Sequence, residues 1–166
     1  METDLTYRIA PMSLDVRLVS AGMLCIPAVF LAVVLAGDYV LCGPLVFVCV
    51  IYAWVWLLFR PTAFIIHPEE IEIVWPLKRR TIRRDSITSA RIIDVKELKR
   101  DIGWGARVGA GGLWGGFGWL WTTKRGIVQM YISRTDRFVW LERGTERPWL
   151  VTPERPKEFV RELIPR

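Results

Sequence analysis

The chain has 166 residues, of which 52% are hydrophobic, and its formal net charge is +6 at pH 7. Its mean hydropathy is positive, which suits a small membrane protein with one compact extramembrane domain and excludes a multidomain protein. The charge is uneven: residues 1–59 hold two Arg and four acidic residues, a net of −2, whereas residues 60–166 hold 21 basic and 13 acidic residues, a net of +8. The basic part therefore lies outside the membrane.

Two runs without a charged residue, 18–37 and 39–59, are separated only by Asp38. At 1.5 Å per residue each makes a helix of about 30 Å, the thickness of the hydrocarbon layer of a bilayer. We predict a transmembrane helical hairpin, with helices at about 16–37 and 39–59, after a short cytoplasmic tail of residues 1–15. A hairpin buried in a soluble domain is one alternative, but the 107 residues that follow are too few to cover it. A signal peptide is the other, although its apolar region is usually about 7 to 15 residues.

The orientation of the hairpin is predicted by the positive-inside bias of short loops. Arg8 and Arg17 precede the first helix and Arg60 closes the second, whereas the turn at Gly37-Asp38 contains no Lys or Arg. We expect a multi-pass protein of the inner (cytoplasmic) cell membrane, with both termini in the cytoplasm.

After Pro61 the pattern changes to the alternation of β-strands. Strands are expected at 63–67 and 71–75, joined in a hairpin by Pro68-Glu69-Glu70. The segment 78–84 carries cations on both alternating faces, so we expect it to be edge-like or to project from the body. Further strands are predicted at 87–95, 127–133, 137–142 and 149–151.

Residues 103–118 hold eight of the 13 glycines, interleaved with aromatic residues. The spacing GxGxxxG, with no glycine followed by Lys-Ser or Lys-Thr, excludes a nucleotide-binding loop. One interpretation is a loop or a pair of bulged strands whose backbones approach closely. The other is a loop that lies in the membrane interface beside the hairpin. Its interface residues would be Trp104, Trp114, Phe117, Trp119 and Trp121.

The last segment has the pattern of a helix that begins at Thr152-Pro153, since Thr is a favoured N-cap and Pro a favoured first residue. Phe159 with Leu163, and Val160 with Ile164, form i, i+4 apolar pairs on one face. We expect this face to close one end of a sheet domain.

About seven strands capped by one C-terminal helix form the plan of a pleckstrin-homology-like (PH-like) β-barrel or sandwich, which makes the expected fold an α+β membrane protein. From residue 60 to 166 the chain resembles bacterial PH-like domains that follow two membrane helices in small bacterial proteins. The resemblance rests on the glycine-rich stretch from Arg107 to Gly118 and on the helix start. The helix-start residues are Thr152, Pro153, Glu154, Pro156 and Phe159.

This resemblance implies a cytoplasmic domain, residues 60–166, on a membrane anchor, and it supplies no catalytic residues. Eukaryotic relatives bind phosphoinositides through basic residues around their first hairpin. Here that turn is the acidic Pro68-Glu69-Glu70, so this specificity does not transfer.

Few side chains suit catalysis. His67 is the one histidine, and all three cysteines fall inside the apolar runs. A His-dependent triad would rest entirely on His67, and no convergent set of metal ligands is visible. We therefore predict a protein that is not an enzyme and has no cofactor and no metal.

Five cations fall within seven residues: Lys78, Arg79, Arg80, Arg83 and Arg84. Near an anionic leaflet each contributes about 1 kcal/mol of attraction. A solvated edge strand that uses charge to block sheet pairing explains them equally well. Nucleic acid is not expected as a partner, because the chain has a membrane anchor and no recognisable reading helix.

Two functions from different classes remain. In the first, the domain is a non-enzymatic membrane-anchored binding module that holds a protein or peptide partner, including copies of itself, at the inner leaflet, because a sheet edge can dock an extended peptide. In the second, it is a lipid-surface sensor that uses the basic cluster and the Gly-Trp loop to bind anionic headgroups. High ionic strength should weaken the second kind of binding far more than the first.

Overall fold

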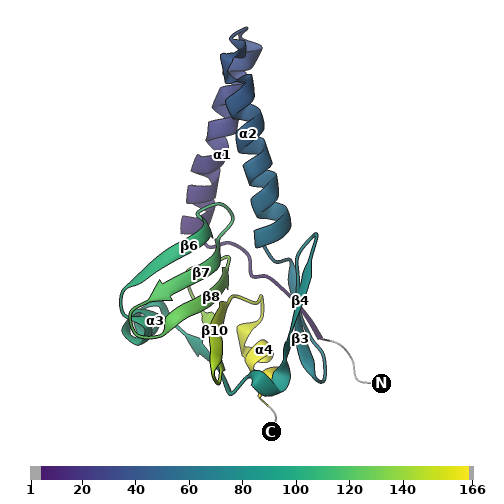
Figure 1. Ribbon diagram of the computed structural model, residues 1–166, viewed down its shortest axis with the longest axis vertical. Coiled ribbons are helices and arrows are strands. Elements are labelled where there is room, and N and C mark those ends of the chain that lie inside the picture. The colour runs from purple at the N-terminus through teal and green to yellow at the C-terminus, as the bar shows by residue number, and fades with distance from the viewer. Residues whose placement is uncertain (1–4, 165–166) are drawn as a thin grey trace.

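The computed structural model describes residues 5–164 and has two parts, a helical hairpin and an α+β domain at its base (Figure 1). The hairpin contains α1 (Leu14–Leu35), a 3-10 turn (Tyr39–Leu41), α2 (Cys42–Trp54) and a π-helical turn (Val55–Phe59). The spans Leu14–Leu35 and Tyr39–Phe59 are long and apolar enough to cross a membrane, as predicted. The protein buries only 6% of the first span and 0% of the second, so this is not the hairpin of a soluble core.

The domain contains two sheets. In the first, four antiparallel strands lie in the order β1-β2-β3-β4. They are β1 (Leu5–Arg8), β2 (Ala63–Ile66), β3 (Glu70–Val74) and β4 (Arg79–Arg83). The second has six strands in the order β5-β9-β10-β8-β7-β6, and only β10 and β8 pair in parallel. They are β5 (Ser89–Ile93), β6 (Gly105–Gly111), β7 (Gly116–Thr122), β8 (Gly126–Ile132), β9 (Phe138–Arg143) and β10 (Glu146–Val151).

The two sheets do not close into a barrel, so the barrel expectation is corrected to two open sheets with ten strands among the described residues. Most predicted strands recur within a few residues, and β4 lies at a sheet edge as its charges predicted. A short 3-10 turn (Arg84–Ser86) links the first sheet to the second. A groove opens between the two sheets.

The N-terminal segment contains a strand that the sequence pattern did not reveal. Residues 1–4 of the predicted tail lie outside the described residues, but β1 pairs with β2, with Tyr7 opposite Phe64. Leu5 and Tyr7 alternate with Thr6 and Arg8, but the run is only four residues long and only Tyr7 is buried. The hairpin is thus inserted between two neighbouring strands of one sheet.

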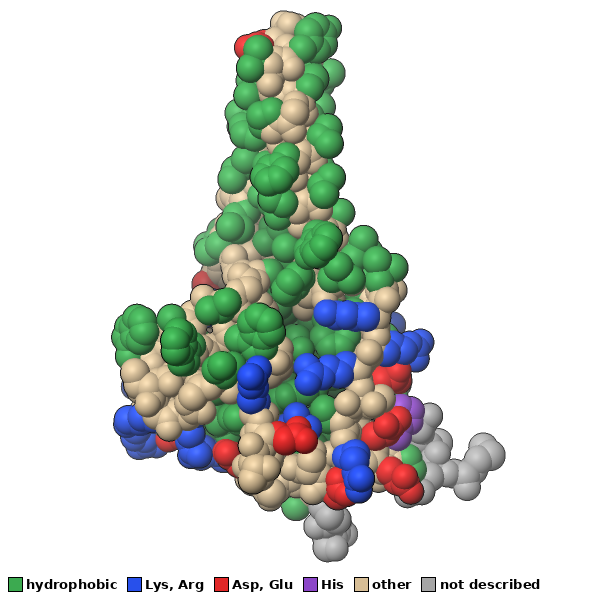
Figure 2. Space-filling view, viewed as in Figure 1, with side chains coloured by type: hydrophobic (Ala, Val, Ile, Leu, Met, Phe, Trp, Pro, Cys, Tyr) green, Lys and Arg blue, Asp and Glu red, His purple; other side chains and the backbone are tan. Residues whose placement is uncertain are grey.

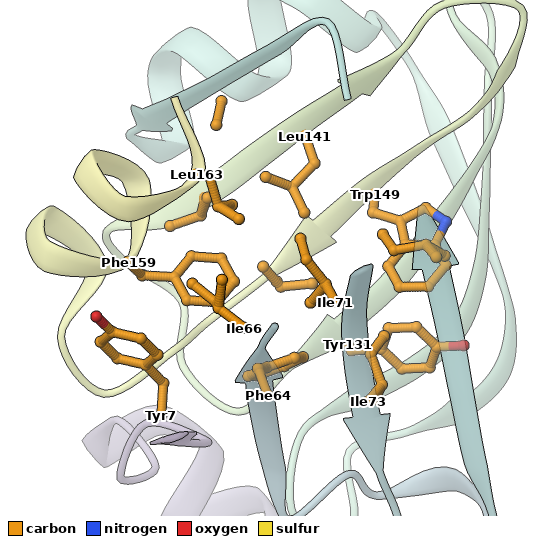
Figure 3. Close-up of a cluster of buried hydrophobic side chains, with 14 of the residues drawn as sticks. Tyr7, Phe64, Ile66, Ile71, Ile73, Tyr131, Leu141, Trp149, Phe159 and Leu163 are labelled. Carbon is orange, nitrogen blue, oxygen red and sulfur yellow. The ribbon is translucent and has the colours of Figure 1, made fainter. Parts of the chain in front are cut away.

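The main core lies between the two sheets and α4 (Pro156–Leu163), as Figure 3 shows. Phe159 is fully buried, with its ring 5.3 Å from that of Tyr7 and 5.9 Å from that of Phe64. The helix begins at Pro156 rather than at Thr152-Pro153. Thr152 is buried, and its hydroxyl accepts a hydrogen bond from the Ser133 amide at 2.9 Å, so it cannot cap the helix.

The opposite face of the six-stranded sheet is covered by α3 (Val95–Ile102), which the sequence analysis missed. Asp94 caps this helix by accepting a hydrogen bond from the Glu97 amide at 2.7 Å. Leu98 and Ile102, four residues apart, pack on the sheet. The Asp-x-x-Glu pattern at 94–97 was a signal for this helix.

Candidate ligand-binding groove and hairpin contact

The glycine-rich stretch is a β-hairpin, as the first interpretation predicted. Gly109 of β6 faces Gly118 of β7, with φ angles of 135° and 124°. A Cβ at Gly109 would lie 2.4 Å from the carbonyl oxygen of Phe117, and one at Gly118 would lie 2.6 Å from that of Val108. Only glycine allows the two strands to approach this closely.

The tip of this β-hairpin docks at the base of the two apolar helices α1 and α2 (Figure 1). Ser20 of α1 is buried; its hydroxyl donates to the carbonyl oxygen of Gly112 at 3.0 Å and accepts from the Trp114 amide at 2.8 Å. The Trp114 ring packs edge-on against Trp56 at 4.7 Å and Tyr52 at 6.3 Å. The β6–β7 turn therefore contacts both helices.

The fold places the five aromatic residues that were predicted for the interface in different surroundings. Trp114 packs on the hairpin, and Phe117 is buried at 1% exposure. Trp104, Trp119 and Trp121 are exposed at 73%, 46% and 65%. Trp119 and Trp121 share one face of β7, because side chains alternate along a strand.

A cavity of about 680 Å³, here called the basic groove, opens between the two sheets beside the end of the second membrane span. Figure 2 shows Lys and Arg side chains over an apolar hollow below the hairpin. The groove is lined by Leu58, Phe59, Lys78, Arg80, Gly109, Gly118, Trp119, Gln129, Tyr131, Arg143, Thr145, Glu146, Arg147 and Trp149. Its wall thus combines four cations, one acid, aromatic rings and an apolar edge.

Two arginines flank Trp149. The guanidinium carbon of Arg80 lies 5.2 Å from the centre of the indole ring and that of Arg143 lies 5.1 Å from it. Arg143 is buried, forms an ion pair with Glu146, and lies 3.3 Å from the Ser86 hydroxyl through Nη2. Burial lowers the pKa of Arg143, but a guanidinium stays protonated at neutral pH.

Lys78 lies at the membrane end of the groove. Its ammonium is 4.7 Å from the ring centre of Trp75 and 5.7 Å from that of Phe59. Burial, and then the charge of Arg80, lower the pKa of Lys78, which means that the site lacks compensating negative charge.

The chain also has a half-buried guanidinium where the second span ends. Arg60 stacks on Trp56 at 4.4 Å, and burial lowers its pKa. Its Nε is buried and has no hydrogen-bond partner within residues 5–164. A buried donor of this kind calls for an acceptor, and an anion would supply one.

The polar wall of the groove is held by Gln129. Its amide nitrogen donates to the carbonyl oxygen of Gly118 at 3.1 Å and to the hydroxyl of Tyr131 at 3.0 Å, and its oxygen accepts from the Trp119 indole at 3.0 Å. This network fixes Tyr131 and Trp119 in place. Burial raises the pKa of Tyr131, so its hydroxyl stays protonated and can donate to a ligand.

The predicted basic cluster does not form one surface. Lys78 and Arg80 line the groove, since Arg80 shares a strand face with the buried Ile82. On the other face of β4, Arg79 pairs with Glu72 at 3.1 Å and Arg83 pairs with Asp85. Arg84 donates to the carbonyl oxygen of Glu162 at the end of α4. Sequence reasoning missed Arg143 and Arg147, which lie about 60 residues away along the chain.

His67 lies 3.5 Å from Glu72 through its Nε2, within a partly exposed pair. Within the part of the chain that the structure describes, no three His, Cys, Asp or Glu side chains come together as metal ligands.

The described residues combine two open sheets, a C-terminal helix, a cation-lined groove and two helices that are long and apolar enough to span a membrane. A protein-family model described as "Bacterial PH domain" matches residues 62–166. The chain therefore belongs to the bacterial PH domain family, and PH domains are typically non-catalytic binding modules. Comparison with curated proteins and with solved structures found no match.

Proposed function

We propose that the protein is a non-enzymatic membrane-anchored binding module whose basic groove holds the headgroup of an anionic phospholipid at the cytoplasmic face of the membrane. The observation that carries the proposal is the position of the groove. Its cations, Lys78 and Arg80, lie next to Leu58 and Phe59 at the end of the second membrane span. A lipid could therefore place its phosphate on the cations while its chains remain against the apolar edge.

The charges of the groove support an anionic ligand. Four cations line it against the single acid Glu146, which already pairs with Arg143. Arg60, which follows Phe59 directly, has a buried Nε that finds no acceptor within residues 5–164. Cations near the cytoplasmic leaflet attract anionic lipids with about 1 kcal/mol each.

The orientation is part of the proposal. Because β1 precedes the hairpin and pairs with β2 behind it, the two ends of the hairpin belong to one domain, which supports placing both ends on the same side of the membrane. The Arg residues near these ends favour the cytoplasmic side. Exposed Trp119 and Trp121 would then seat the domain in the membrane interface beside the groove.

The test uses the full chain in neutral detergent, titrated with a short-chain phosphatidylglycerol and followed by tryptophan emission, to which Trp149 contributes. Replacing Lys78 and Arg80 by Gln should weaken binding at least about tenfold, since a hydrogen bond to a charged group contributes about 1.5–3 kcal/mol. The matched control is the double variant R79Q/R83Q, which removes the same charge from the other face of β4.

High salt should weaken binding to the wild-type chain, and glycerol phosphate should bind more weakly than the lipid, because it cannot use Leu58 and Phe59. Equal losses in K78Q/R80Q and R79Q/R83Q would show that only net charge matters, and the groove would not be the site.

A second candidate function, docking of a protein strand, is favoured by one observation. β6 is the last strand of its sheet, has no proline and has Arg107 as its only charged residue. A sheet edge with so little protection pairs readily with another strand. In this case the partner strand, which a second copy of the chain could supply, would extend the six-stranded sheet.

Replacing the exposed Val108 by Lys should then abolish concentration-dependent dimerisation in detergent, because a charge protects an edge. Mass photometry or sedimentation measures it, and Leu77→Lys, in the exposed β3–β4 turn, is the control. A wild-type chain that stays monomeric across the concentration range removes self-pairing as its role.

A further inference from the structure

A second cavity, of about 440 Å³, lies on the other face of the six-stranded sheet, beneath α3. It is here called the α3 pocket, and its volume is within the range of about 300–1,000 Å³ that is usual for small-ligand sites. Its floor is apolar and includes Leu98 and Ile102 of α3 with Leu120, Met130 and Leu150 of the sheet. None of the described residues that line it is acidic.

The pocket is open on the side of β6 because this strand has few side chains that could fill it. Positions 105 and 107 share one strand face, and position 105 is a glycine that lines the pocket. Arg107 is therefore the one side chain of this set that stands over the pocket. The absence of a side chain at Gly105 leaves room for an apolar chain, since a Cβ there would lie 3.2 Å from the Leu120 side chain.

The two cations of the pocket come from different elements. Lys99 lies on α3 and Arg107 on β6, and neither forms an ion pair within residues 5–164. The acids of α3, Glu97 and Asp101, are held by Arg91 at 3.3 Å and 2.5 Å. The pocket thus presents unpaired positive charge beside an apolar floor, which complements a ligand with an apolar chain and one anionic end.

The pocket adjoins the membrane anchor. Thr135, which lines it, donates its amide hydrogen to the hydroxyl of Ser13 at 3.3 Å, and Ser13 is the residue before α1. An amphiphile dissolved in the adjoining leaflet would be close to this wall.

We propose that the α3 pocket binds a long-chain fatty acid, with the acyl chain on the apolar floor and the carboxylate between Lys99 and Arg107. A single chain fits the pocket, which is smaller than the basic groove, and one carboxylate matches one cation on each side. The site is separate from the basic groove and does not depend on the function proposed for it.

The experiment uses the full chain in nanodiscs of neutral phosphatidylcholine, with 11-(dansylamino)undecanoic acid as the probe and energy transfer from tryptophan as the signal; Trp104 lines the pocket. Hexadecanoate should displace the probe. The double variant K99Q/R107Q should bind the probe about tenfold more weakly, because each change removes a hydrogen bond to a charged group at an exposed site. The probe partitions into the bilayer to the same extent for all variants. Partition therefore does not change the ratio of the dissociation constant of a variant to that of the wild type.

Two further arms complete the test. K78Q/R80Q, in the basic groove, should bind the probe as the wild type does, and Leu120→Trp should abolish binding by filling the pocket. If the Leu120→Trp protein does not fold, the binding of the probe to K99Q/R107Q tests the proposal. The proposal is overturned if K99Q/R107Q binds like the wild type, if K78Q/R80Q loses the signal as well, or if hexadecanol competes as well as hexadecanoate.

Discussion

Replacing Phe159 by alanine should lower the free energy of unfolding of the extramembrane domain by about 3–5 kcal/mol, the usual cost of removing a buried Phe side chain. Phe159 is 0% exposed and packs against Tyr7 of β1 and Phe64 of β2 (Figure 3). Its loss opens a cavity where the N-terminal strand, the first sheet and α4 meet. Urea denaturation of the full chain in mild detergent, followed by near-UV circular dichroism, measures the change.

Ile164→Ala is the control, since Ile164 follows α4 and is 49% exposed. It should change the free energy of unfolding by less than about 0.5 kcal/mol, as surface substitutions usually do. If Phe159→Ala cost no more than this control, α4 would not close the core.

Replacing Gly115 by alanine should destabilise the domain by about 2–5 kcal/mol, the sum of a left-handed backbone penalty and of overpacking. Gly115 has a φ of 147°, and an added Cβ would lie 2.1 Å from the carbonyl oxygen of Ile132. The same change would displace the turn that holds Trp114 against the membrane helices. The denaturation midpoint reports the first effect and tryptophan emission the second.

Gly111→Ala is the matched control in the same hairpin, because a Cβ there meets nothing within 4 Å and its φ is not positive. It should leave the midpoint unchanged or raise it slightly, because alanine reduces the entropy of the unfolded chain. If Gly115→Ala and Gly111→Ala had the same denaturation midpoint, the backbone at Ile132 would move enough to accommodate the added Cβ.

The sequence predicted what depends on local pattern. The two long apolar helices follow from two uncharged runs, and the strands follow from alternation near Ile71 or from a short apolar run such as that around Val139. The short β1 was missed because its alternation covers only four residues, of which only Tyr7 is buried. The helix α3 was missed for a different reason: it is eight residues long, and its cap lies directly after an apolar strand.

The groove was predictable only in part, because its two walls come from different sheets. Lys78 and Arg80 were recognised as cations, but their neighbours Arg79 and Arg83 differ from them only in the face of β4 on which they lie. Arg143 is far away in sequence, and only the stacking of both sheets around Trp149 brings it to Arg80.

The pairing of β1 with β2 has a practical consequence for work on the domain without its anchor. A version that begins at Pro61 loses β1, which uncovers Phe64 and removes Tyr7 from the core. The Ile9 amide donates to the carbonyl oxygen of Thr62 at 3.1 Å, so the chain leaves and re-enters the sheet at adjacent points. A soluble form is therefore better made by excising the helices and joining the segment that ends near Ala10 to Thr62 through a few glycines, which turns the anchor into an ordinary hairpin loop.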